Sequence, residues 1–138
     1  MTFRKYLNAV PEESAVIRQE VFVSEQGFND EFDEYDKRSV HLVMLDGNEA
    51  VATLRFYSEG GGSYHVGRVA VRKSRRGEGL GRLLMEEAVK VIRALGGTEM
   101  TVGAQEDKSG FYESCGFERC GERYFEQDYP HVNMRKRL

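Results

Sequence analysis

The most regular pattern of apolar and polar positions in the chain runs from residue 80 to residue 95. Apolar residues recur there at spacings of three and four, with charged residues between them, as on an amphipathic helix. The apolar set is Leu80, Leu83, Leu84, Ala88, Val91, Ile92 and Leu95. Gly96 and Gly97 follow at once, and glycine is common just beyond a helix end. The pattern therefore predicts a helix over 80–95.

Shorter apolar or alternating runs predict strands. They span residues 2–8, 40–45, 50–57, 65–71, 99–103, 117–124 and 131–137. The turn sequence Asp46-Gly47-Asn48 predicts a hairpin between the second and third of these strands. Three consecutive glycines within 58–63 predict a flexible connection to the fourth.

Two further helices complete the predicted elements. Pro11 suits a first helical turn, and the apolar pair Ile17 and Val21 continues that helix to about Phe22 or Val23. Residues 107–114 predict a short helix that ends at Gly116. This order of elements predicts a mixed α/β sheet in a single domain, 1–138, and leaves the topology open.

The segment between the first helix and the hairpin is strongly acidic, with six carboxylates between Glu25 and Asp36. Blocks of like charge are usually solvated, which favours an exposed loop. The interleaved Phe28, Phe32 and Tyr35 favour packing against the domain instead. Both interpretations stay open.

A basic, glycine-rich stretch lies between the strand at 65–71 and the long helix. Its cations are Arg72, Lys73, Arg75, Arg76 and Arg82, in a chain of net charge −3. Gly77, Gly79 and Gly81 allow a tight turn and close approach of a ligand, and the helix N-terminus that follows favours an anion. The spacing matches neither a P-loop nor a dinucleotide fingerprint. A phosphate-bearing ligand is expected, and an ATP-binding module stays among the alternatives.

Composition narrows the class of protein. The 138 residues are 40% hydrophobic and 31% charged, which is typical of a folded domain. No apolar run of membrane-spanning length and no basic-then-apolar leader occurs, so a cytoplasmic protein without a membrane partner is expected. The acidic balance argues against nucleic acid as a partner. Cys115 and Cys120 lack metal-ligand spacing, so free thiols and no metal are expected.

Several segments resemble the GNAT N-acetyltransferases. The segment Arg76-Gly77-Glu78-Gly79-Leu80-Gly81 after a Val-Ala-Val strand resembles the family's acyl-CoA loop. Residues 111–117, Phe-Tyr-Glu-Ser-Cys-Gly-Phe, resemble a second family segment, and 17–27 and 121–134 resemble its ElaA/YjcF-like branch. The resemblance implies the GNAT acyl-CoA N-acyltransferase fold, an α/β (α+β) fold whose mixed central sheet has splayed strands four and five. It also implies acetyl-CoA as co-substrate and a small amine that attacks the thioester directly. A CoA-binding sensor or interaction module of the same fold is the alternative, and a homodimer is possible.

The resemblance also implies roles for individual residues. Backbone groups of Val69, Ala70 and Val71 would hold the pantetheine arm and thioester oxygen, with Val71 N–H as oxyanion donor. The pyrophosphate would lie against Arg76, Gly77, Glu78, Gly79, Leu80, Gly81 and Arg82. Many members carry an Asn-x-x-Ala pattern where this chain has Gln105 and Lys108, and Gln105 is the expected substitute for the asparagine.

Three residues are the candidates for proton transfer. Tyr112 matches the family's general acid for the departing thiolate, with a core aromatic role as the alternative. Glu25 is the first candidate for the base and His131 the second, although an ion-paired glutamate and a structural histidine are equally ordinary. A nucleophilic Cys115 is rejected, because no His/Asp partner is evident.

Overall fold

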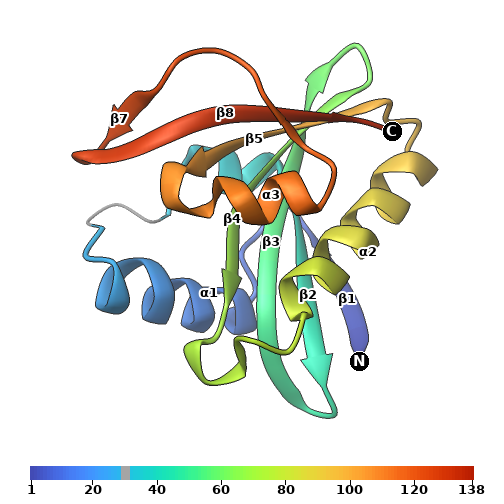
Figure 1. Ribbon diagram of the computed structural model, residues 1–138. Helices are drawn as coiled ribbons and strands as arrows, with labels where there is room; N and C mark the ends of the chain where they lie inside the picture. The colour runs from blue at the N-terminus through green and yellow to red at the C-terminus, as the bar shows by residue number, and fades with distance from the viewer. Residues whose placement is uncertain (29–31) are drawn as a thin grey trace.

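A computed structural model describes residues 1–28 and 32–138, and its centre is one mixed sheet of eight strands (Figure 1). The strands are β1 (Thr2–Leu7), β2 (Val40–Asp46), β3 (Glu49–Gly60), β4 (Ser63–Val71), β5 (Glu99–Gln105), β6 (Glu118–Arg119), β7 (Tyr124–Glu126) and β8 (Tyr129–Arg137). Their order is β1-β2-β3-β4-β5-β8-β6, with β7 also paired to β8. Among the strands of the described residues, β4 and β5 are the one parallel pair.

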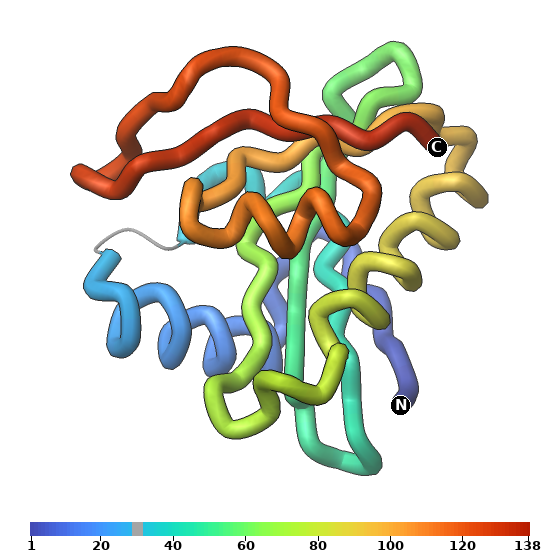
Figure 2. Tube along the Cα trace, viewed as in Figure 1, coloured from blue at the N-terminus to red at the C-terminus, as the bar shows by residue number. Residues whose placement is uncertain are grey.

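Helices connect and cover these strands. They are α1 (Glu12–Arg18) with its π-helical continuation η1 (Gln19–Glu25), α2 (Leu80–Ala94) and α3 (Ser109–Ser114). Short 3₁₀ turns occur at η2 (Glu34–Arg38), η3 (Lys73–Arg75) and η4 (Glu106–Lys108). The predicted long helix is thus confirmed, and the trace in Figure 2 shows the chain turning at the end of β4 and rising directly into α2.

The sheet opens between its two parallel strands. Residues 63–66 of β4 pair with 99–102 of β5, and pairing stops there although both strands continue. In Figure 1, β4 runs down between α1 and α2 while β5 and β8 cross above it. The prediction of splayed strands four and five is confirmed.

A β-bulge in β4 accompanies this opening. Thr53 pairs with Ala70 and Arg55 with Gly67, so Arg68 and Val69 together face the single residue Leu54. Arg68 has a φ of 51°, which a β strand does not adopt. The extra residue bends the strand and resets its alternation, so that Val66, Val69 and Val71 all pack on the α2 side and Ala70 packs on the α1 side.

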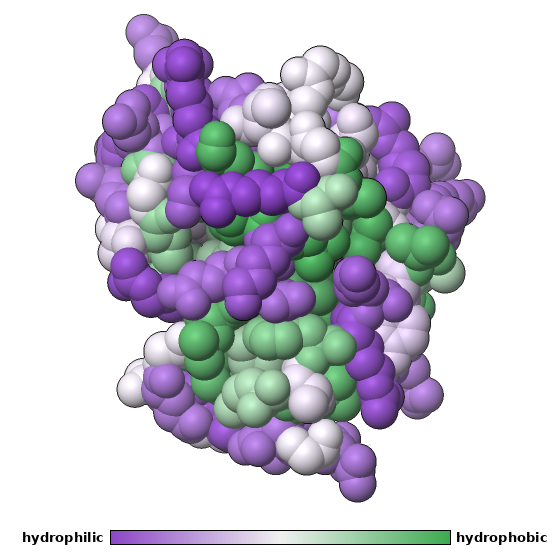
Figure 3. Space-filling view, turned by 90° about the vertical axis from the view of Figure 1, so that its right-hand side faces the viewer, coloured by the Kyte–Doolittle hydropathy of each residue, from purple (hydrophilic) through white to green (hydrophobic). Residues whose placement is uncertain are grey.

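Two layers of apolar side chains flank the sheet. The larger cluster joins Leu84, Ala88 and Ile92 of α2 and Tyr112 of α3 to the sheet. The smaller cluster joins Ile17, Val21 and Phe22 to Ala70 on the opposite face. Figure 3 faces the α2 side and shows hydrophilic residues over much of it, with apolar residues between them. The apolar face of α2 therefore packs against the sheet, as the amphipathic pattern of the sequence predicts.

Three sequence predictions are corrected. The connection at 58–63 is a tight turn of Gly61 and Gly62 between extended β3 and β4, because both glycines adopt a positive φ. The strand predicted at 117–124 is two short strands, β6 and β7, with Gly121 at φ 95° between them. The first helix continues past Val23 to Glu25 as η1.

Candidate active site

The opening between β4 and β5 forms a cavity of about 550 Å³. Its wall combines the bulged end of β4, the end of β5, the N-terminus of α2, one face of α3, the end of η1 and the β7–β8 turn. Of the predicted site residues, those that line it are Val69, Ala70, Val71, Arg76, Gly77, Gly79, Leu80, Gly81, Arg82, Gln105, Tyr112 and His131. Glu25 and Glu78 do not.

The free edge of β4 presents alternate backbone groups to the cavity. Arg72 N–H donates to Val51 O on β3 at 3.0 Å, and Arg76 Nε donates to Val71 O at 3.1 Å from the other side. Since N–H and C=O groups of successive strand residues point in opposite directions, those of Val69 and Val71 point away from β3 and those of Ala70 point toward it. The predicted backbone role therefore fits Val69 and Val71, whereas Ala70 contributes only its small side chain.

The glycines of the loop serve two different purposes. Gly77 and Gly79 have φ values of 82° and 75°, and no atom lies within 4 Å of where their Cβ atoms would be. They let the backbone turn and leave its N–H groups open in front of α2. At Gly81 a Cβ would lie 3.1 Å from the Phe111 ring, so this glycine allows α2 and α3 to approach each other.

The arginines of the loop are held by exposed carboxylates. Arg76 forms a bidentate pair with Glu25, at 2.6 and 2.9 Å, and Arg72 pairs with Glu20 at 3.1 Å. Arg75 contacts Asp46 at 2.8 Å and Glu78 at 3.1 Å. The loop is thus positioned by surface ion pairs that an incoming anion can replace.

Tyr112 belongs to both the core and the cavity. Its ring packs edge-on against Phe111 and Phe117, at centroid distances of 5.1 and 5.7 Å, and the residue is 8% exposed. Burial raises the pKa of Tyr112 above its ordinary value, so the phenol keeps its proton at neutral pH. Its hydroxyl makes no hydrogen bond within the described residues, which leaves it to interact with a ligand.

Gln105 lies at the end of β5 with half of its amide satisfied. Nε2 donates to Gln26 Oε1 at 2.8 Å, whereas Oε1 is buried and has no hydrogen-bond partner in the described part of the chain. A buried acceptor of this kind fits an N–H donor of a bound ligand, such as an amide of a pantetheine arm.

The two predicted bases have different surroundings. The hydrogen bonds from Arg76 lower the pKa of Glu25, which makes this carboxylate a weaker base. His131 is 5% exposed, pairs with Gln105 across β5 and β8, and lines the cavity. Its Nδ1 lies 2.8 Å from Tyr129 O, and because a carbonyl oxygen only accepts, Nδ1 carries the proton in the neutral ring. Nε2 is then the nitrogen that can accept one.

Comparisons with known proteins match this architecture. The family description "Acetyltransferase (GNAT) domain" matches residues 7–138. The chain belongs to the GNAT acetyltransferase family. It is 32% identical over 123 residues to the N-acetyltransferase YjcF of Bacillus subtilis (strain 168), with 87% of each chain covered. Escherichia coli ElaA has a TM-score of 0.85 at 25% identity over 98% of each chain. An acyl-CoA N-acyltransferase from Pseudomonas aeruginosa has a TM-score of 0.86 at 28% identity over 99% of each. The predicted family and fold are confirmed.

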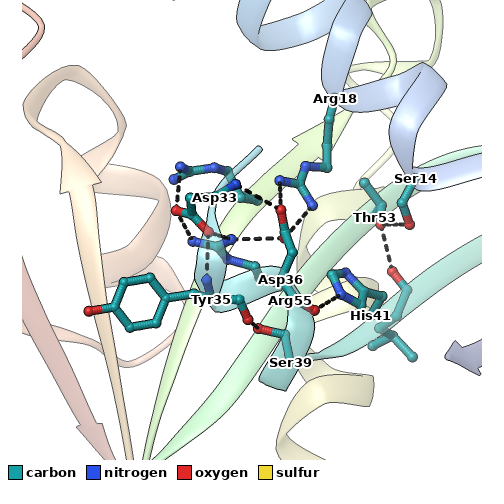
Figure 4. A network of polar contacts seen from close by, with 11 residues as sticks. Ser14, Arg18, Asp33, Tyr35, Asp36, Ser39, His41, Thr53 and Arg55 are labelled. Carbon is teal, nitrogen blue, oxygen red and sulfur yellow. Dashed lines mark hydrogen bonds and ion pairs between the residues drawn. The ribbon is translucent and has the colours of Figure 1, made fainter. Parts of the chain in front are cut away.

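In this GNAT acetyltransferase two carboxylates of the acidic segment, Asp33 and Asp36, belong to an ion network with buried arginines (Figure 4). Asp36, 5% exposed, accepts from Arg18 at 2.9 and 3.1 Å and from Arg55 at 2.8 Å. Asp33 accepts from Arg55 at 3.0 Å and from Arg68 at 3.1 Å. Of the two open interpretations, packing on the domain therefore holds for Asp36, whereas Glu34 is exposed and Asp30 and Glu31 lie outside the described residues.

Two residues that the sequence did not single out as candidates also shape the cleft. Glu126 of β7 lines the cavity, with Oε2 3.7 Å from His131 Nε2. Tyr124 stacks on His131 at 5.6 Å, and its hydroxyl lies only 2.6 Å from where a Cβ on Gly103 would be. Gly103, a glycine inside a predicted strand, was the one local signal of this close approach.

Among the described residues, no group of three or more His, Cys, Asp and Glu side chains could hold a metal ion. No described helix is long and apolar enough to cross a membrane.

Proposed function

We propose that the chain transfers the acetyl group of acetyl-CoA to a small primary amine by direct attack of the amine on the thioester, within one domain spanning residues 1–138. The observation that carries this proposal is the composition of one cavity. It joins the unpaired edge of β4, an open helix N-terminus and the Tyr112 hydroxyl. The β4 edge would bind the thioester, the helix N-terminus would bind the pyrophosphate, and the hydroxyl would stabilise the leaving thiolate.

The thioester would lie along the free edge of β4. Val69 and Val71 offer backbone groups there without competition from β5. As the amine attacks, negative charge develops on the thioester oxygen, and a fixed backbone donor such as Val71 N–H stabilises it. The pyrophosphate would lie at Gly77 and Gly79, where loop N–H groups and the α2 dipole favour an anion.

Tyr112 would serve the departing thiolate. A phenol pKa of about 10 against about 8.5 for a thiol makes full proton transfer uphill by roughly 2 kcal/mol, and burial increases this difference. Hydrogen-bond stabilisation of the developing sulfur charge is therefore the larger part of its role.

His131 is the better placed of the two candidate bases. Removing a proton from an alkylammonium at neutral pH costs roughly 4 to 5 kcal/mol, so an acceptor within the cavity is useful. His131 Nε2 belongs to a cavity residue and is an acceptor in the neutral ring, whereas Glu25 lies outside the lining and pairs with Arg76.

A steady-state assay of thiol release from acetyl-CoA across a panel of amines tests the proposal. Acceptor-dependent release supports transfer; CoA binding without such release would favour the sensor alternative. A calorimetric comparison of CoA and ATP tests the remaining nucleotide-binding reading, which requires tighter binding of ATP.

A further inference from the structure

The charges that line the cavity are divided between its two ends. The cationic lining residues near the loop and α3 are Arg75, Arg76, Arg82 and Lys108. Among the described lining residues Glu126 is the only carboxylate, and it lies at the other end, beside His131. A polyanion fits the first end, whereas the lining cation nearest the second end is Arg68, which is ion-paired with Asp33.

The other acidic residues near this end are already engaged. Arg68, the lining cation of the β4 bulge, has Asp33 as its counter-ion at 3.1 Å. Asp36 binds Arg18 and Arg55. By contrast, the Glu126 side chain is 56% exposed, and its nearest basic group is the His131 ring at 3.7 Å. Glu126 therefore contributes a negative charge that no arginine pair offsets in the described structure.

The surroundings of Glu126 are aromatic. Phe22 and Phe28 line the cavity, and Phe28 contacts Tyr129 at a centroid distance of 5.5 Å. Tyr124 stacks on the His131 ring at a centroid distance of 5.6 Å. Burial raises the pKa of Tyr124, and the Glu126 carboxylate adds to this effect, so the phenol stays uncharged beside it. This end of the cavity combines apolar walls with a single negative charge.

We propose that Glu126 selects the acceptor: a short alkyl or arylalkyl primary amine that enters as an ammonium ion, with no carboxylate next to the nitrogen. This inference rests on the proposed function. The ammonium would lie between the Glu126 carboxylate and His131 Nε2, with its hydrocarbon part against Phe22 and Phe28. A carboxylate beside the nitrogen would face Glu126 and be repelled.

In the proposed reaction the attacking nitrogen loses two protons. One ammonium N–H bond breaks and an N–H bond forms at His131 Nε2, giving an imidazolium that Glu126 stabilises. The freed lone pair forms the C–N bond as the C–S bond breaks, and the Tyr112 hydroxyl donates a hydrogen bond to the departing sulfur. The second proton of the attacking nitrogen leaves as the amide forms and reaches the thiolate through solvent. The products are the N-acetyl amine and the free thiol of CoA, and His131 returns its proton to solvent.

The test uses three acceptor probes with acetyl-CoA: n-butylamine, benzylamine and phenylglycine, which is benzylamine with a carboxylate on the carbon next to nitrogen. The wild type should use phenylglycine at least about tenfold less efficiently than benzylamine in kcat/KM. Glu126→Gln should raise the KM of benzylamine at least about tenfold, the range expected for a lost charged contact. It should leave CoA affinity unchanged and narrow the gap to phenylglycine.

Asp128→Asn is the matched control, because Asp128 lies in the same turn, is exposed and does not line the cavity. It removes the same charge, and asparagine tolerates the positive φ of 64° at that position. Benzylamine constants should stay within about twofold of the wild type. Equal effects of the two variants, or unchanged constants in Glu126→Gln, would overturn the role of Glu126 and leave the transferase standing. Turnover of phenylglycine without turnover of the two uncharged-side-chain amines would also overturn the role of Glu126 and leave the transferase standing. No thiol release with any probe, although CoA binds, would overturn the proposed function together with this inference.

Discussion

The sequence contains one run of acidic residues and one run of basic residues, and the structure gives the two runs different roles. Asp36 is buried against Arg18 and Arg55, which are 1% and 4% exposed, and Asp33 pairs with Arg55 beside it. The cations of residues 72–76 stay at the surface, where they pair with exposed carboxylates such as Glu20 and Glu25. The first cluster holds the fold together, and the second faces the cavity that we assign to CoA.

The difference lies in what can replace each partner. Removing one member of a buried ion pair typically costs 3 to 5 kcal/mol, because a desolvated charge is left behind. A surface pair contributes only about 0 to 1 kcal/mol, so a phosphate group can displace its carboxylate at little cost. A count of charges does not distinguish these cases; burial does.

The largest expected effect is on stability. Asp36→Asn removes the charge that faces both buried guanidinium groups, so the free energy of unfolding at pH 7 should fall by about 3 to 5 kcal/mol. Urea denaturation measures this change. Glu34→Gln, an exposed neighbour in the same 3₁₀ turn, should change stability by less than about 0.5 kcal/mol. If Asp36→Asn lowers the free energy of unfolding by less than about 1 kcal/mol, Asp36 contributes no more than an exposed surface ion pair.

Acid should weaken the same network. Hydrogen bonds from Arg18 and Arg55 outweigh the effect of burial and lower the pKa of Asp36 from 3.8 to about 2. The resulting contribution, roughly 2 kcal/mol, is fully present above the unfolded pKa of 3.8 and is lost as pH falls toward 2. Urea midpoints measured between pH 5 and pH 2 should therefore decline more in the wild type than in Asp36→Asn. Parallel declines would contradict the assignment.

The loop should respond in ligand affinity. Gly79→Val places a β-branched side chain at a φ of 75°, at the start of α2 and beside the proposed phosphates. CoA affinity measured by calorimetry should fall at least about tenfold, since the turn that aims the loop N–H groups is disturbed. Circular dichroism should show that the fold is retained. If a folded variant binds CoA as tightly as the wild type, the loop does not hold the pyrophosphate.

The smallest expected effect concerns the carboxylate that competes for the loop. Glu25→Gln frees Arg76 from an exposed ion pair, so CoA should bind up to about fivefold more tightly. Glu20→Gln, which acts on Arg72 outside the cavity lining, should have less effect. A fall in kcat with a shifted acidic limb of the pH profile would instead identify Glu25 as the base; a higher acceptor KM alone would identify it as an amine attractor.

Much of the fold could be predicted from local sequence, because the strands, the β2–β3 turn and α2 are encoded by residues that are neighbours in the chain. The glycine-rich loop in front of α2 was predictable for the same reason, since its glycines and the start of α2 are contiguous. The end of the cavity beside Glu126 and His131, where we place the acceptor, could not be predicted in this way. It depends on a bulge at Arg68 and on the pairs of Arg68 and Arg55 with Asp33, whose members are far apart in the chain. Such contacts are fixed by packing, which periodicity does not describe.

A single-turnover measurement of acetyl transfer by Tyr112→Phe tests the central claim most directly. The substitution keeps the ring packed against Phe111 and Phe117 and removes only the hydroxyl of this cavity-lining residue. With an amine that the wild type uses, the transfer rate should fall by roughly 10² to 10⁴-fold, while CoA affinity and the urea midpoint stay close to wild type. A loss smaller than about threefold would contradict the account and leave Tyr112 as an aromatic residue of the core.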